Sequence, residues 1–182
     1  INDAALQRIG RETSLTIDFG GGVKTAADLE KVLDCGVAQV TLGSLAAHQP
    51  QVVRQWLEAY GPERFILGAD FKAGRIATQG WTQQSDWELE AFIEAYLPLG
   101  LRRVIPTDVS RDGTLQGPAL EIYRRLLARH PLELIASGGI RDAAHLQALN
   151  DLGCYGAIVG KAFYEGHLDL NTLARLQNDF LK

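Results

Sequence analysis

The chain has 182 residues, of which 46% are hydrophobic and 22% are charged, and its formal net charge is −4. This is the composition of an ordinary globular domain with a substantial core. No basic stripe indicates a nucleic-acid surface, and no apolar run approaches the roughly 20 residues of a membrane helix. No signal-peptide pattern opens the chain, so we expect a cytoplasmic protein without nucleic-acid or membrane partners.

The cysteines and histidines give no sign of a metal site. Cys35 and Cys154 stand alone, without the spacing of metal ligands, and the four histidines are scattered. We therefore expect two reduced core cysteines and no metal. The sequence also lacks a nucleophile elbow, a P-loop and a dinucleotide-binding motif, so we expect no cofactor.

Strand-like and helix-like runs alternate along the chain in order. Six short apolar runs predict buried strands. They cover residues 14–19, 37–43, 64–70, 102–108, 132–137 and 155–160. Because a helix-like segment follows each run, we expect an α/β protein with a parallel sheet and helices outside it.

Local signals mark the first helices. Thr25 and Asp28 form a predicted capping box, and Gly36 is placed to end that helix. An apolar face over residues 52–60 predicts the next helix. Ser85 with Glu88 suggests a second capping box, for a helix that ends near Gly100.

Later helices carry weaker signals. Pro118 is read as a first-turn proline of a helix that continues through Leu126. Asp142 is the expected N-cap of the next helix, and a final helix is expected over about 171–181. The one irregular segment, residues 71–81, looks like a short hairpin over a strand end, where long loops are often functional.

One short run occurs twice. The stretch ASGGIRDAAHL at 136–146 repeats DFGGGVKTAADL at 18–29, with a constant offset of 117 residues. The register extends over 16–46 and 133–163, which indicates an internal repeat. Each repeat holds four strand–helix units, and two repeats make the eight units of a (β/α)₈ barrel of about 250 residues.

The chain is therefore predicted to be a single barrel domain over residues 1–182. It would contain strands three to eight, about six of the eight β/α units, from a barrel of two similar halves. A six-stranded doubly wound sheet is the alternative. Since the chain starts at Ile1 and contains no Met, we expect the first strands to precede it in a parent protein.

Glycine-rich turns follow strands in both halves. Glycine lets backbone N–H groups approach a ligand, and a helix N-terminus adds positive character. The predicted phosphate-binding residues are Gly21, Gly22, Gly43 and Ser44 in one half, and Gly138, Gly139, Gly160 and Lys161 in the other. Lys24 and Arg141 add charge nearby. The glycines could instead serve only tight turns; as a set they favour a ligand with a phosphate at each end.

Barrel catalysts lie at the C-terminal ends of strands. Asp70 ends the third predicted strand, and Thr107 with Asp108 ends the fourth, followed by the loop 110–113. Trp81 ends the irregular segment, where it could stack on a flat ring. The competing interpretations are loop capping for the acids and core packing for Trp81.

Four motifs carry a resemblance to a known family. They are TDVSRDGTLQGP at 107–118, GADFKAGRIATQGW at 68–81, FGGGVK at 19–24 and IVGKAFYEG at 158–166. Together they resemble the ProFAR isomerases of histidine biosynthesis, end to end along the chain. The runner-up is the cyclase subunit of imidazole glycerol phosphate synthase, which shares the two-half barrel but usually has different residues at the first motif and at Gly43 and Ser44.

The resemblance implies an Amadori rearrangement, in which ProFAR becomes PRFAR without a cofactor. It assigns Asp70 as the acid, Thr107 and Asp112 as helpers at the sugar, and Trp81 as a stacking aromatic. Arg111 and Gly113 join the substrate-binding set.

The family's base is an Asp on the first strand, which has no counterpart in this chain. The resemblance therefore implies that the chain is inactive without that strand and monomeric when complete. An inactive bis-phosphate-binding remnant is a further alternative. Phosphoribosylanthranilate is a less favoured second substrate.

Overall fold

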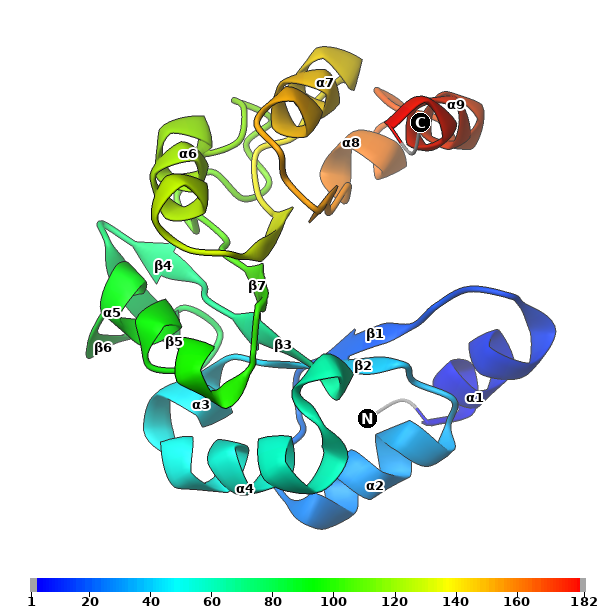
Figure 1. Cartoon of the computed structure of the whole chain (residues 1–182). Coiled ribbons are helices and arrows are strands. Elements are labelled where there is room, and N and C mark those ends of the chain that lie inside the picture. Colours follow the sequence, from blue (N-terminus) through cyan, green and yellow to red (C-terminus); the bar gives the residue numbers. More distant parts are fainter. Residues whose placement is uncertain (1–2, 181–182) are drawn as a thin grey trace.

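The computed structural model describes residues 3–180 and shows a parallel six-stranded sheet with helices along its outer side (Figure 1). The strands are β1 (Asp18–Gly20), β2 (Gln39–Leu42), β3 (Phe65–Gly68), β7 (Arg103–Ile105), β8 (Glu133–Ala136) and β9 (Gly156–Ala157). They are arranged in chain order, and all five pairings are parallel. A doubly wound sheet reverses its strand order at a switch point, so this sheet is a barrel wall.

Helices cover the outer side of the wall. They are α1 (Asp3–Glu12), α2 (Ala26–Asp34), α3 (Ser44–His48), α4 (Pro50–Tyr60), α5 (Leu89–Glu94), α6 (Leu120–Arg129), α7 (Ala143–Asp151), α8 (Lys161–Tyr164) and α9 (Leu170–Phe180), with short 3₁₀ turns at Pro62–Arg64 and Leu97–Leu99. No helix among residues 3–180 has the length and apolar character that crossing a membrane requires. The predicted partial (β/α)₈ barrel is confirmed.

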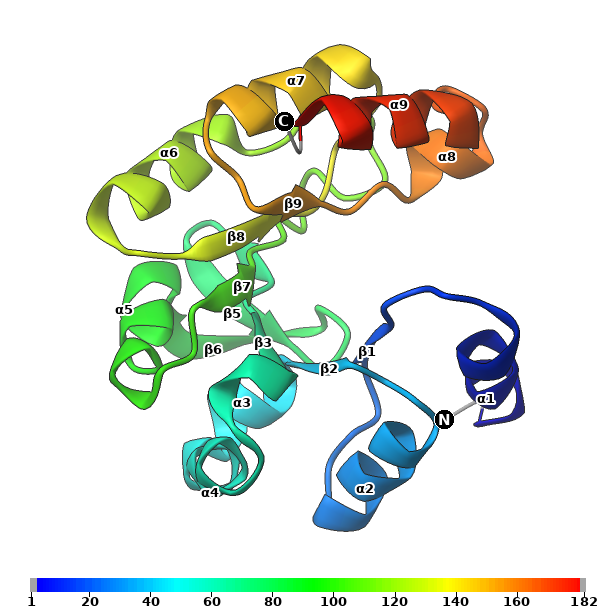
Figure 2. The same cartoon turned by 45° about the vertical axis from the view of Figure 1, so that its right-hand side comes forward.

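The sheet and its helices form an open arc (Figure 2). One end carries α1 and β1, and the other carries β9, α8 and α9. Within residues 3–180, β1 and β9 end the sheet and do not pair with each other.

The core lies between the sheet and the helices, and strand alternation decides which side chains enter it. Val40 and Leu42 of β2 are at most 2% exposed and join the core cluster. Thr41 lies between them and faces the opposite side of the sheet. A Cβ built on Gly20 or Gly68 would lie 3.3 or 3.0 Å from side-chain atoms of Thr41, so glycines on the neighbouring strands make room for it.

Three of the predicted helix ends are confirmed. Thr25 Oγ1 accepts a hydrogen bond from Asp28 N at 3.2 Å, and Asp28 Oδ2 accepts one from Thr25 N at 2.9 Å. Gly36 follows the C-cap of that helix with a φ of +86°. Asp142 Oδ1 accepts from His145 N at 3.1 Å and caps α7.

The capping box predicted at Ser85 and Glu88 is wrong. These residues belong to strand β6 (Gln83–Glu88), which pairs with β5 (Arg75–Thr78) in a three-stranded antiparallel sheet completed by β4 (Phe71–Lys72). Ser85 Oγ donates to Ile76 O at 3.3 Å instead. Tertiary pairing therefore overrides the local signal, and the predicted hairpin is larger than residues 71–81.

Several boundaries also differ from the predictions. Helix α6 begins at Leu120, so Pro118 lies outside its first turn. Helix α5 stops at Glu94, well before Gly100, and a 3₁₀ turn that contains Pro98 follows, since proline cannot donate to a continuing helix. All six strands are shorter than the predicted runs, because residues at the ends of these runs lie in loops outside the hydrogen-bonded ladder. The final helix is described to Phe180, and its expected end at Leu181 lies outside the described residues.

A buried hydroxyl allows a test of this fold. Thr78 is 2% exposed, and its Oγ1 has no hydrogen-bond partner among residues 3–180. We expect Thr78→Val to raise the free energy of unfolding by about 1 kcal/mol, because it removes an unsatisfied buried polar group. The measurement is urea unfolding followed by circular dichroism.

The matched control is Thr41→Val. Thr41 Oγ1 donates to the Asp18 carboxylate at 2.8 and 2.9 Å, so the same substitution should lower stability there. Loss of stability in Thr78→Val would contradict the packing described here.

Candidate functional site

All six strands end at the same edge of the sheet, and the loops there form the candidate site. A cavity of about 870 Å³ opens among the loops after β1, β2 and β3. Six of the predicted site residues line it: Gly21, Gly22, Lys24, Gly43, Ser44 and Asp70. The structure therefore brings the first glycine-rich set together with the predicted acid.

The first glycine turn requires glycine for its backbone conformation. Gly21 has a φ of +91° and Gly22 has a φ of +77°. A Cβ on Gly21 would meet no atom within 4 Å, so φ is the constraint there and not space. Capped helix α2 follows directly, with Lys24 at the wall of the cavity.

The tip of the antiparallel hairpin reaches over this cavity. Trp81 Nε1 donates to Asp70 Oδ2 at 2.7 Å, and Gln79 N donates to Ser44 Oγ at 3.1 Å. Gln79, Gly80 and Trp81 have φ values of +52°, +63° and +70°, three left-handed residues in succession. Such a conformation is costly for non-glycine residues and is maintained here by the two contacts. The tip thus links the predicted acid to the first glycine-rich set.

The loop after β7 holds the second set of predicted residues. Thr107 is 5% exposed. Asp108 Oδ1 accepts from Ser110 N at 3.0 Å and Ser110 Oγ at 2.6 Å, and Asp108 Oδ2 lies 3.3 Å from Arg111 Nε. Asp108 therefore shapes the loop. The Asp112 side chain has no hydrogen bond or ion pair with any residue from 3 to 180, which leaves it available to a ligand.

The second glycine turn packs against this loop. Gly138 and Gly139 have φ values of +90° and +78°, nearly those of the first turn. Gly117 N donates to Gly139 O at 2.8 Å, and a Cβ on Gly139 would lie 2.3 Å from Gly117 O. Arg111 Nη1 also donates to Gly117 O, at 3.1 Å. Here close backbone contact adds to the φ requirement.

Lys161, at the start of α8, connects the loop after β9 to the loop after β7. Its Nζ donates to Gly113 O at 2.8 Å and lies 3.6 Å from Glu165. Gly160 has φ and ψ of −105° and −95°, close to the −106° and −90° of Gly43. The glycines related by the 117-residue offset thus share backbone geometry at both turns.

A buried tyrosine joins the C-terminal ends of β7 and β8. Tyr123 of α6 is fully buried, and its hydroxyl lies 2.8 Å from Ser137 O and 3.1 Å from Pro106 O. Burial raises the pKa of Tyr123, so it stays a neutral donor. The loops after β7 and β8 are therefore held together by a contact on the core side of the site.

Sequence reasoning missed four polar residues that line the cavity: Thr41, His48, Gln49 and Gln79. Thr41 could have been found, because its neighbours Val40 and Leu42 are apolar and strand alternation turns it inward. No local pattern marks His48 or Gln79, since the folding of distant segments brings them to the cavity.

Outside the site, the thiols fit the predicted core role. Cys35 is buried and Cys154 is half-buried, both as free thiols, and burial raises the pKa of Cys154 to about 11.

His130 is less isolated than its sequence neighbours suggest. Ligand atoms of His130, Glu90 and Glu94 lie within 4.8 Å of one another. Glu90 Oε1 already accepts from Arg129 Nη1 at 2.8 Å, and the Arg129 contact lowers the pKa of Glu90. The described residues therefore form an ion-pair network that joins α5 to α6.

The packing of the second glycine turn yields a test. We expect Gly139→Ala to lower the free energy of unfolding by about 2 kcal/mol more than Gly153→Ala, as measured by urea unfolding. Both glycines have positive φ, 78° and 86°, so both variants carry the same backbone strain. Only at Gly139 must a backbone carbonyl also move. Equal losses in the two variants would show that the turn is not tightly packed.

Comparison with known proteins agrees with this geometry. The model of the family described as "Histidine biosynthesis protein" matches residues 1–169. A relative from Cytophaga hutchinsonii is 43% identical over 176 residues, which is 96% of this chain and 73% of the relative. One from Bacteroides thetaiotaomicron is 45% identical over 174 residues, 95% of this chain and 73% of the relative.

A third relative, from Flavobacterium psychrophilum, is 42% identical over 182 residues, 100% of this chain and 74% of the relative. All three carry the name 1-(5-phosphoribosyl)-5-((5-phosphoribosylamino)methylideneamino) imidazole-4-carboxamide isomerase. By its barrel wall, its sequence motifs and these matches, the chain belongs to the histidine biosynthesis protein family, among its isomerases.

Proposed function

We propose that the chain provides the site of an isomerase that converts ProFAR to PRFAR by an Amadori rearrangement, an aldose-to-ketose isomerisation. The observation that carries the proposal is the spatial order of the site. One glycine turn follows β1, its counterpart follows β8, and Asp70 and Thr107 follow β3 and β7, two of the three strands between them. This order suits a substrate with a phosphate at each end and a sugar in the middle.

The phosphates would bind at the two glycine-rich sets. The first phosphate-binding site, called the first seat, consists of Gly21, Gly22, Gly43 and Ser44, with Lys24. The second seat consists of Gly138, Gly139, Gly160 and Lys161. Backbone N–H groups of the glycine turns, and those that follow Gly43 and Gly160, where no side chain caps the backbone, offer donors. Lys161 would exchange its contact with the Gly113 carbonyl for a phosphate oxygen.

The reaction opens a ribose ring and moves a proton between two neighbouring carbons, so it needs an acid and a base. Asp70 is the only carboxylate among the described residues that line the cavity. We assign it the acid role, with Thr107 and Asp112 assisting at the sugar. Trp81 would stack on the substrate once its Nε1 releases Asp70, and Arg111 with Gly113 would contact the substrate from the neighbouring loop.

The isomerase is favoured over the cyclase, because the relatives compared above are named as isomerases. We further propose a single barrel domain with an internal repeat over 16–46 and 133–163. We also propose that the protein acts in the cytoplasm and as a monomer when the barrel is complete. The bis-phosphate-binding remnant stays the second candidate.

A binding experiment tests the two seats. We expect Ser44→Asp and Lys161→Glu each to weaken binding of ProFAR at least tenfold in isothermal titration, because each places a negative charge at one phosphate. Ribose 5-phosphate, with a single phosphate, should lose affinity in only one of the two variants.

Gln55→Glu is the control, since Gln55 is exposed on α4. It adds a negative charge away from the site and should leave ProFAR binding unchanged. Unchanged binding in both seat variants would contradict the two-phosphate assignment.

Turnover tests the chemistry. In the barrel completed by its first strands, Asp70→Asn should lower kcat at least 100-fold and change KM little, because proton transfer is lost and the phosphates still bind. Trp81→Phe keeps an aromatic ring and loses the Nε1 donor, so its loss in kcat should be smaller. Equal kcat in Asp70→Asn and the unchanged protein would overturn the acid assignment. ProFAR binding without any turnover in the completed barrel would favour the remnant.

A further inference from the structure

The helices that follow the two glycine turns differ in one side chain near their first turn. The 117-residue offset places His145 of α7 at the position that Asp28 has in α2. Each is the third residue of its helix, and each is half-buried. An ionised aspartate is an acceptor only, whereas each histidine nitrogen can donate or accept a hydrogen bond. The chemistry of the second turn therefore depends on what the His145 ring contacts.

Asp28 shows what this position does in the first turn. Its Oδ2 accepts from Lys24 N at 3.1 Å and from Thr25 N at 2.9 Å. The hydrogen bond from the Thr25 hydroxyl, at 2.9 Å, and these backbone contacts lower the pKa of Asp28, so it stays an acceptor. Asp28 thus fixes the path of the chain between the glycines and the helix.

His145 makes the corresponding contact in the second turn. Its Nδ1 accepts from Arg141 N at 3.2 Å, as Asp28 accepts from Lys24 N. Its own backbone N–H donates to Asp142 Oδ1 at 3.1 Å. A ring nitrogen of histidine accepts a hydrogen bond only when it carries no proton. The contact with Arg141 N therefore requires a neutral ring with its proton on Nε2.

The other edge of the ring lies against the loop after β7. A Cβ built on Gly117 would be 3.3 Å from His145 Nε2 and 3.4 Å from its Cε1, so the ring covers this glycine closely. Gly117 is buried, and its N–H donates to Gly139 O at 2.8 Å. Its carbonyl accepts from Arg111 Nη1 at 3.1 Å. His145 therefore contacts a residue that joins the second glycine turn to the loop of Arg111.

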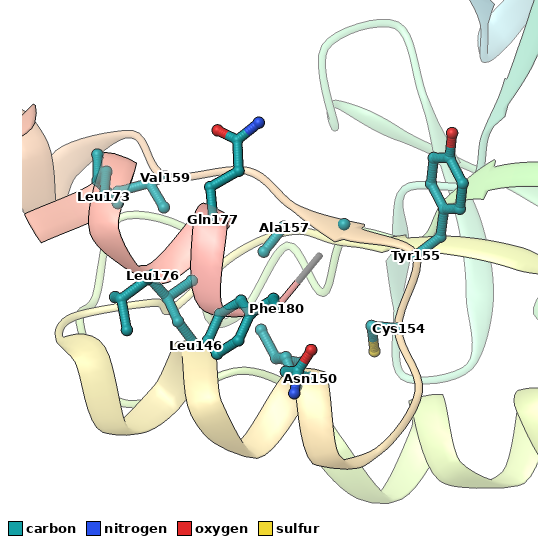
Figure 3. Close-up of a pocket in the computed structure, with 12 residues that line it drawn as sticks. Leu146, Asn150, Cys154, Tyr155, Ala157, Val159, Leu173, Leu176, Gln177 and Phe180 are labelled. Carbon is teal, nitrogen blue, oxygen red and sulfur yellow. The ribbon is translucent and has the colours of Figure 1, made fainter. Parts of the chain in front are cut away.

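The apolar face of α7 sets the direction of this ring. Figure 3 shows Leu146, the next residue in the helix, among the side chains gathered between α7 and α9. Leu146 and Leu149 are both buried and belong to the core cluster. Successive residues of a helix point about 100° apart, so the same packing that buries these leucines turns His145 toward Gly117. The helix cannot rotate without taking the leucines out of the core.

We infer that His145 is a positioning residue of the second seat: its neutral ring accepts from Arg141 N through Nδ1 and secures the glycine turn to the loop after β7 at Gly117. The two glycines are thereby kept in the orientation that a phosphate needs. Arg141 N is occupied by this contact, as Lys24 N is in the first seat, so neither donates to the ligand. The inference rests on the proposed function for its ligand and on the geometry alone for the positioning.

Helix capping is the competing interpretation. The cap of α7 is formed by the Asp142 side chain and the backbone N–H of His145, so it does not need an imidazole. A side chain that only fills the space beside Gly117 could be replaced by another ring. An acceptor for Arg141 N could not. The decisive variants are therefore one that keeps a ring and one that keeps an acceptor.

The positioning is tested first without a ligand, by NMR of the 182-residue chain. We expect ¹⁵N spectra at alkaline pH to show the His145 proton on Nε2. In His145→Phe, which keeps a ring and loses the acceptor, the Arg141 and Gly117 amides should exchange about fivefold faster. The Lys24 amide, which Asp28 accepts from, should be unchanged. A proton on Nδ1, or equal exchange of Arg141 in both proteins, would overturn the inference.

Binding of ProFAR, measured by isothermal titration, tests the consequence for the seat. His145→Phe should weaken binding about fivefold, because one ordering hydrogen bond is lost. His145→Asn should bind within about twofold of the unchanged chain, because its amide oxygen can accept as the Asp28 carboxylate does. His130→Phe is the matched control, since His130 is also half-buried and contacts Glu90 away from the seats. It should bind ProFAR normally.

The outcomes separate the interpretations. Unchanged binding in His145→Phe would overturn the inference, and so would a loss in His145→Asn as large as that in His145→Phe, because shape alone would then explain both. Circular dichroism checks that each variant is folded; if His145→Phe is not, the proton position in the unchanged chain and the binding by His145→Asn decide. Faster exchange at Arg141 in His145→Phe, with no binding of ProFAR to the unchanged chain, would support the positioning and count against the proposed function alone.

Discussion

In a parallel sheet, the carboxyl ends of all strands meet at one edge, and this constraint decides where the chain can do chemistry. Eighteen or more residues separate any two successive strands of the barrel wall, and every connection must return to the same starting edge. The returning helices bury their apolar faces against the sheet, which fixes the strands. The loops at the other edge are then free to carry glycines, acids and the hairpin without disturbing the core.

Because the sheet and its helices fix the strand ends, only a few contacts are needed to position the loops of the site. Tyr123 fixes the loops after β7 and β8 from the core side, and Gly117 fixes the second glycine turn from the outside. At the first turn, a Cβ on Gly21 would meet no atom within 4 Å, and the hairpin tip instead contacts Ser44 through Gln79 and Asp70 through Trp81. The two halves therefore have similar backbones but different packing around them.

The sequence predicted most of the fold because the repeat and the strand–helix alternation are both strong, chain-long patterns. Local rules were reliable where one residue acts on its neighbours, as with Thr25 and Asp28. They failed at Ser85, because the same pattern suits a strand when a partner such as β5 lies beside it. Within the site, the strand-end residues were accessible to sequence reasoning. His48 and Gln79 were not, because only the folded chain brings them to the cavity.

The near-identical backbones of the paired glycines have a consequence for directionality. Gly21 and Gly138 differ by 1° in φ, and Gly22 and Gly139 also by 1°. Backbones so alike cannot by themselves tell the head of a two-phosphate molecule from its tail. Orientation must then come from side chains that differ between the two seats, and Ser44 and Lys161, which the 117-residue offset relates, are such a pair. The direction of the bound molecule is thus set by side-chain chemistry on a nearly symmetric backbone.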